Sequence, residues 1–190
     1  MTRDELDKIK KSFIPIGKDC PLEVACLLTV MKYYGGAEKA ETLTEWCKVD
    51  GKLSLIGMRD AAIRAGMKAE ICLQDMEQLS LRELPVILCM EDDFGIPGYV
   101  VCYGMHENRF IVWEPGFGPM QYRANEIKAL WIKGVTLILF PTLEFMQKAH
   151  FYYKWWELYP WSKRWKRRLD SCYEYIWLHV PWFRHLNRWP

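Results

Sequence analysis

The chain of 190 residues lacks the marks of several large protein classes. Its seven cysteines contain no Cys-x-x-Cys pair, and Cys102 with His106, at a plausible ligand spacing, has no second pair to complete a zinc site. No apolar stretch approaches the roughly 18 residues of a membrane-spanning helix. The first residues are too charged for a signal peptide, and no glycine-rich phosphate-binding motif occurs. We therefore expect no metal, no cofactor and no ATPase module, in a cytoplasmic protein with reduced cysteines.

Net charge is also low, at +2, but it is unevenly distributed. Residues 151–190 contain eight basic and three acidic side chains, so the first 150 residues carry −3. The same 40 residues hold seven of the ten tryptophans. The chain therefore joins two different compositions near residue 145.

The strongest helical pattern follows Asp19-Cys20-Pro21. We expect Asp19 to be the N-cap, Pro21 to lie in the first turn and Gly35-Gly36 to end the helix. Two shorter helices are predicted, at about 40–47 and from Ser54 as N-cap to Gly66. Short β-branched or aromatic segments then predict strands over 67–73, 85–90, 99–103, 109–113 and 135–140. Helices followed by a largely antiparallel sheet indicate an α+β fold.

Cys20 is the first candidate for chemistry, because a thiol at a helix N-terminus is stabilised as thiolate by the helix dipole. The alternative interpretation is a buried, inert cysteine at a helix start. The surrounding sequence favours the first. A series of short motifs follows Cys20 in order: Val24 to Leu27, Tyr33-Tyr34-Gly35, Leu53 to Met58, Leu84 to Ile87, Gly98 to Val101, Glu114 to Gly118, Glu126, Trp131, Gly134-Val135 and Pro141-Thr142.

In order and spacing these motifs resemble the bacteriocin-processing, double-glycine leader peptidases, which are papain-like cysteine peptidase domains of peptide-exporting ABC transporters. The resemblance implies a papain-like α+β domain over residues 13–142, preceded by an N-terminal helical segment (1–12) and followed by an aromatic, basic extension (143–190). It places the family's nucleophile on Cys20. Two extra residues separate Cys20 from the Tyr-Tyr-Gly motif, and Pro21 stands where the family has glycine.

The other catalytic positions of the family fall on unsuitable residues. The resemblance places the oxyanion-hole glutamine on Ile14, the catalytic histidine on Gly98 and the orienting aspartate on Glu114. Papain-type chemistry needs an imidazole beside the sulfur and a donor for the oxyanion. Gly98 and Ile14 provide neither, so the site is predicted to be catalytically degenerate.

Other ionisable residues do not fill these roles. His106 is eight residues from Gly98 along a predicted strand, roughly 25 Å away at about 3.3 Å per residue. The other three histidines, at 150, 179 and 185, lie beyond the family region, so only a tail that folded back over the cleft would supply one. Glu91-Asp92-Asp93 forms an acidic loop before Gly98, which we expect to be solvated.

The C-terminal extension is predicted to contain a helix after Pro160 whose first turns are crowded with lysine and arginine. Its tryptophan-rich apolar side is typical of a helix that lies in a membrane interface. The aromatic residues could instead pack on the domain or on a second copy, with the basic residues facing water. Stacking on single-stranded nucleic acid ranks last.

The leading hypothesis is a degenerate leader-peptidase-like domain that binds a peptide beside an export transporter, at the cytoplasmic face of the membrane. One alternative is an active cysteine peptidase that cleaves leader peptides with Cys20 as nucleophile and an unconventional base. Another is a membrane-associated interaction protein whose function depends on residues 151–190.

Overall fold

The computed structural model describes residues 3–36, 38–81, 85–92, 95–114 and 116–146, all within the unit Met1–His150. The predicted helix after Pro160 and the rest of the aromatic, basic extension lie outside these residues. The helices are α1 (Arg3–Ser12), α2 (Leu22–Tyr33), α3 (Ala40–Trp46), α4 (Leu55–Arg64), α5 (Met76–Ser80) and α6 (Ala124–Leu130). The strands are β1 (Lys48–Val49), β2 (Lys52–Leu53), β3 (Met67–Leu73), β4 (Val86–Glu91), β5 (Pro97–His106), β6 (Arg109–Glu114), β7 (Gly118–Tyr122) and β8 (Trp131–Pro141).

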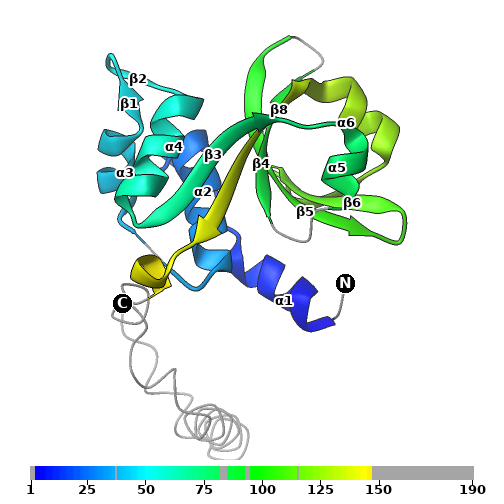
Figure 1. Cartoon of the computed structure of the whole chain (residues 1–190), viewed down its shortest axis with the longest axis horizontal. Coiled ribbons are helices and arrows are strands. Elements are labelled where there is room, and N and C mark those ends of the chain that lie inside the picture. Colours follow the sequence, from blue (N-terminus) through cyan, green and yellow to red (C-terminus); the bar gives the residue numbers. More distant parts are fainter. Residues whose placement is uncertain (1–2, 37, 82–84, 93–94, 115, 147–190) are drawn as a thin grey trace, which may run out of the picture. The chain divides into compact units, whose positions relative to one another are not determined.

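A six-stranded antiparallel sheet forms the centre of the domain, in the order β3-β8-β4-β5-β6-β7 (Figure 1). The strands β1 and β2 form a separate hairpin. Helices α1 to α4 precede most of the sheet in the chain, which confirms the predicted α+β class. None of the described helices combines the length and the apolar character that crossing a membrane requires.

Both faces of the central strands β4, β5 and β8 are buried, and successive side chains of a strand point to opposite faces. Ile87 of β4 belongs to a core cluster shared with α1 to α4, whereas its neighbours Val86 and Leu88 belong to a second cluster with Leu79 of α5 and Ile127 of α6. Figure 1 shows these two groups of helices apart from one another, with strands of the sheet between them. The continuous apolar runs of β4, β5 and β8 follow from burial on both faces.

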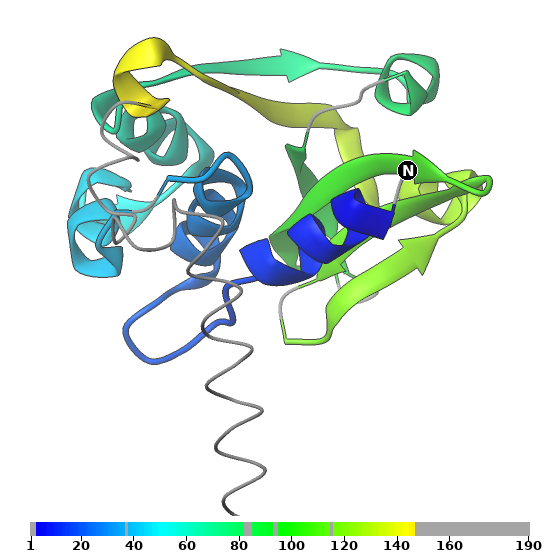
Figure 2. The same cartoon turned by 90° about the horizontal axis from the view of Figure 1, so that it is seen from below.

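The helix α1 lies against the sheet beside β5 (Figure 2). Its last residue, Ser12, is buried and contacts the hydroxyl of Tyr103 at 3.2 Å. Phe13, the next residue, packs edge-on against Trp113 with ring centroids 5.3 Å apart. The N-terminal segment is therefore held on the same face as α2.

The start of α2 differs from the prediction. Its N-cap is Pro21, and no side chain caps it, so the prediction of Asp19 as N-cap was wrong. Residues 17–20 form a tight turn in which Gly17 and Cys20 exchange two backbone hydrogen bonds of 3.1 and 3.2 Å. This turn keeps Asp19 and Cys20 outside the helix.

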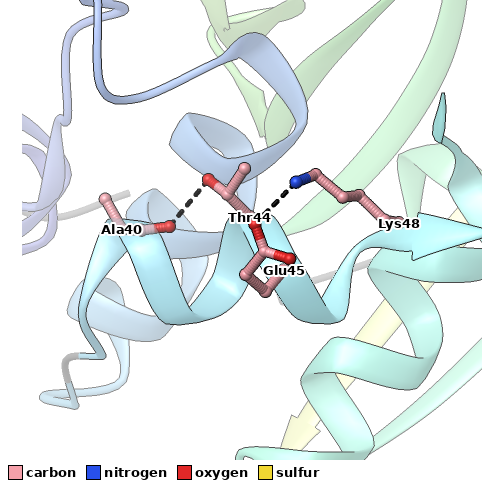
Figure 3. A network of polar contacts seen from close by, with 4 residues as sticks. All are labelled: Ala40, Thr44, Glu45 and Lys48. Atoms are coloured by element: carbon pink, nitrogen blue, oxygen red, sulfur yellow. Dashed lines mark hydrogen bonds and ion pairs between the residues drawn. The ribbon is translucent and has the colours of Figure 1, made fainter. Parts of the chain in front are cut away.

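The small helices α3 and α4 pack closely at Gly57, where a Cβ atom would lie 1.8 Å from the backbone oxygen of Cys47. Ser54 caps α4 as predicted, since its side chain accepts a hydrogen bond from the Gly57 amide at 3.1 Å. Local polar contacts also stabilise α3 (Figure 3). Thr44 donates to the Ala40 carbonyl at 2.8 Å, and Lys48 pairs with Glu45 at 2.6 Å.

The end of the described chain folds back onto the helices. Phe145 is 4% exposed, and its ring covers Gly36 so closely that a Cβ atom there would lie 2.2 Å from a ring carbon. Thr142 donates its hydroxyl to the Gly66 carbonyl and accepts from the Phe145 amide. The packed core thus includes Phe145, three residues beyond Thr142, the predicted end of the domain.

Candidate functional site

A cavity of about 300 Å³ lies at one end of the sheet, where β4 ends and β5 begins. The start of α2 and the end of β6 contribute one residue each, Leu22 and Glu114. Gly98 lines it from β5, so the structure brings two of the four predicted site positions, Gly98 and Glu114, into one cavity.

Leu22 is the side chain that faces Gly98. A Cβ atom built on Gly98 would lie 3.8 Å from the Cδ2 atom of Leu22, which is ordinary van der Waals contact. Leu22 is also the first residue of α2. The group at the helix start opposite Gly98, the position to which the sequence resemblance assigns the histidine, is therefore aliphatic.

Cys20 does not line this cavity. It lies in the tight turn two residues before α2 and packs partly against the core. Burial raises the pKa of the Cys20 thiol, whereas the sequence predicted a lowered pKa. Loss of water around the sulfur disfavours the charged thiolate, and Cys20 lies outside α2, which begins at Leu22.

Ile14 also lies away from the cavity lining. Its side chain packs against the main core cluster, and its backbone amide donates to the Thr29 hydroxyl at 3.2 Å. An isoleucine side chain carries no hydrogen-bond donor. No donor for an oxyanion comes from the Ile14 side chain.

Glu114 ends β6 and accepts a hydrogen bond from the hydroxyl of Tyr122, which also lines the cavity. Burial, followed by this hydrogen bond, raises the pKa of Tyr122 to about 12. The tyrosine therefore stays protonated as the donor of the pair well above neutral pH. Tyr122 was not among the predicted site residues, because it ends the strand β7, which was not predicted.

The acidic loop also belongs to the cavity. Glu91 and Asp92 line it, and Asp92 Oδ1 accepts a hydrogen bond from the Ile96 amide at 2.8 Å. Asp93, the third acidic residue, lies outside the described residues. Among the residues that the structure describes, no lysine, arginine or histidine lines this cavity.

His106 lies at the far end of β5, as its spacing from Gly98 predicted. Its Nε2 atom is 3.7 Å from a carboxylate oxygen of Glu107 in the hairpin turn. The three histidines at 150, 179 and 185 lie outside the described residues. Within the described part of the chain, no imidazole reaches Leu22 or Cys20.

Comparison with known proteins identifies the family and the fold. Residues 17–144 match the model of the peptidase C39 family. Comparison with curated proteins gives no match. Three similar solved structures show the same papain-like α+β fold, which confirms the predicted fold class.

The first of these structures is the peptidase domain of Streptococcus ComA, a bifunctional ABC transporter of a quorum-sensing pathway: TM-score 0.60, 23% identity, covering 68% of this chain and 97% of that one. The second is a double-glycine motif protease from an AMS/PCAT transporter in complex with its leader peptide: TM-score 0.58, 23% identity, covering 68% and 90%. The third is the N-terminal peptidase C39-like domain of a toxin secretion ATP-binding protein from Vibrio parahaemolyticus: TM-score 0.52, 26% identity, covering 65% and 98%.

Proposed function

The chain belongs to the peptidase C39 family, and on that premise we propose that its domain binds a peptide without cleaving it. The observation that carries this proposal is the contact between Leu22 and the open position at Gly98. A papain-type site would need a thiolate and an imidazole to face one another here. The chain has the aliphatic side chain of Leu22 at one position and Gly98, which has no side chain, at the other. Neither can accept or return a proton.

The remaining site residues support the same conclusion. Cys20 is the cysteine nearest to Leu22 in the sequence, and it lies outside the cavity. The pKa of its thiol is raised, so only a small fraction of the thiol is ionised at neutral pH. Ile14 provides no side-chain donor for a tetrahedral intermediate. Glu114 hydrogen-bonds to Tyr122, where an orienting carboxylate would instead hold an imidazole.

A cavity suited to a ligand nevertheless persists in this scaffold. Its wall is mainly apolar, with Leu22, Ile96, Val100 and Leu130, and its volume of about 300 Å³ lies at the lower end of the range for small-ligand pockets. The similar AMS/PCAT protease was solved with its leader peptide. We therefore propose a leader-type peptide as the ligand, bound on the cytoplasmic side beside an ABC transporter.

The test is binding and cleavage of a synthetic double-glycine leader peptide by the full chain. Fluorescence anisotropy measures binding, and mass spectrometry of the same mixture measures cleavage. We expect binding with no cleavage. Replacing Gly98 by phenylalanine fills the cavity and weakens binding by about tenfold or more, equivalent to about 1.4 kcal/mol.

Gly17→Phe is the matched control, because it adds the same ring at a position where nothing lies within 4 Å and which is outside the cavity lining. Its affinity for the peptide should equal that of the unmodified chain. Cleavage of the peptide that Cys20→Ala abolishes would establish an active peptidase instead. Absence of binding at the highest soluble peptide concentration would remove the proposal altogether.

A further inference from the structure

We propose that the cavity binds the side chain of a lysine or arginine of the partner peptide, with its aliphatic stem against Leu22 and Leu130 and its charge beside the carboxylates of Glu91 and Glu114. This specificity rests on the peptide-binding function proposed above. It concerns which residue of a peptide the degenerate site takes, not whether a peptide binds.

The lining of the cavity is negatively charged, which favours a cationic ligand. Three carboxylates line the cavity: Glu91 ends β4, Asp92 follows in the next loop, and Glu114 ends β6. Within the described residues no cationic side chain lines the cavity to neutralise them. A cation of the ligand would provide the missing positive charge.

The carboxylate of Glu114 keeps acceptor capacity for such a ligand. It accepts a hydrogen bond from the hydroxyl of Tyr122. An ionised carboxylate has about four lone-pair positions, so this contact orients Glu114 without saturating it. A fixed carboxylate loses less side-chain entropy when a charged partner binds.

The apolar part of the lining fits the methylene stem of such a side chain. Lysine and arginine bury their methylene stems along apolar surface while the charged end reaches a polar partner. Leu22, Val100 and Leu130 provide such a surface, and Ile96 at the acidic loop is 61% exposed. Gly98 lines the cavity from β5 without adding a side chain to it.

A metal ion fits this arrangement less well. No group of three or more histidine, cysteine, aspartate or glutamate side chains in the described part of the chain is close enough together to hold one. The acidic residues are spread around the cavity and do not surround a single point. An elongated organic cation fits both the carboxylates and the apolar surface of the cavity. Its charge pairs with one or two carboxylates, and its stem fills the apolar part.

The experiment compares pairs of synthetic double-glycine leader peptides that differ at a single residue, arginine or citrulline. Citrulline keeps the shape of arginine but has no charge. The residue is placed in turn at the two positions on either side of the glycine pair. Affinity for the full chain is measured by fluorescence anisotropy at low and at high ionic strength.

We expect at one position the arginine peptide to bind about tenfold more tightly than its citrulline counterpart, with most of the difference lost at high ionic strength. Glu114→Gln should reduce that difference severalfold. Glu70→Gln, which removes an exposed carboxylate on β3 paired with Lys68, should leave it unchanged.

Equal affinity of the arginine and citrulline peptides at every position would overturn this inference and leave the peptide-binding function intact. A difference that Glu114→Gln and Glu70→Gln reduce equally would also overturn it, because the charge would then act at long range and not in the cavity. Failure of every peptide to bind would overturn the proposed function, and this specificity with it.

Discussion

The Cδ2 atom of Leu22 lies 3.8 Å from the place that a Cβ atom would occupy on Gly98. This contact joins the first residue of α2 to the start of β5, and both residues line the cavity. It also determines which substitutions would restore a thiol and an imidazole to facing positions.

We predict that Leu22→Cys together with Gly98→His, in a Cys20→Ala background, creates a reactive thiol. A protonated imidazole beside the sulfur lowers the thiol pKa below its free value of about 8.5. Iodoacetamide labelling followed by mass spectrometry should therefore occur at mildly acidic pH. Leu22→Cys in the Cys20→Ala background, with Gly98 retained, is the control, and identical pH profiles for the two variants would contradict the assignment of these positions.

The thiol of Cys20 should behave in the opposite way. Because burial raises its pKa, alkylation of Cys20 is expected to become appreciable only above the free thiol value of about 8.5. Labelling is measured across a pH series, with Cys20→Ala to identify the modified residue. Rapid labelling at pH 6 would show a stabilised thiolate and revive the hypothesis of an active peptidase.

Tyr122 should make the domain sensitive to alkaline pH. Its pKa is raised to about 12, so the folded state holds the proton more tightly than the unfolded state does at an ordinary value of about 10. The corresponding stability is complete below pH 10 and is lost as the pH rises toward 12. Urea unfolding should show a smaller loss of stability over this range for Tyr122→Phe than for the unmodified chain, and equal losses would contradict the shift.

Phe145 should be required for stability although it follows the last strand. Phe145→Ala removes a ring that is 4% exposed and packed on Gly36, which should lower the free energy of unfolding by about 3–5 kcal/mol. Leu143→Ala, two residues earlier and 83% exposed, should change it by less than about 0.5 kcal/mol. Urea unfolding of both variants tests this, and similar values for the two would show that the segment after β8 does not belong to the core.

Association with a membrane, predicted from the composition of residues 151–190, is tested by co-sedimentation with anionic liposomes. The full chain should pellet and a chain ending at Met146 should not, because each basic residue near an anionic surface contributes about 1 kcal/mol. Ending at Met146 keeps Phe145 in the core. Equal pelleting of both chains would show that the extension is not the membrane anchor.

Much of the fold could be predicted from the sequence because the signals are local. The predicted strands over 67–73 and 109–113 match β3 and β6 within one residue, since their side chains alternate or run apolar over a full strand. The strand β8 is longer than predicted because Lys133 and Gly134 interrupt the pattern with positive φ angles of 48° and 76°. A Cβ atom on Gly134 would lie 2.2 Å from the Gln74 oxygen, so the backbone at Gly134 approaches Gln74 closely. The strand continues through this position.

Other elements gave weak signals. The strand β7 contains Pro119 and two further exposed residues, Met120 and Gln121. Its place at the sheet edge allows them, but they obscure a strand pattern in the sequence. The helix α5 has five residues, too few for a helical period to emerge. Tyr122, the hydrogen-bond partner of Glu114, was missed because it ends β7, whose strand pattern is weak.

By itself the sequence determined the class of the domain, the family resemblance and the absence of an imidazole at position 98, because each depends on residue identity and spacing along the chain. Only the tertiary structure decided that Leu22 faces Gly98 and that Cys20 does not. That outcome depends on where α2 begins, and the two backbone hydrogen bonds between Gly17 and Cys20 hold the cysteine in a turn before the helix. Which side chains share a cavity is decided by such contacts between segments, and no local pattern of residues encodes them.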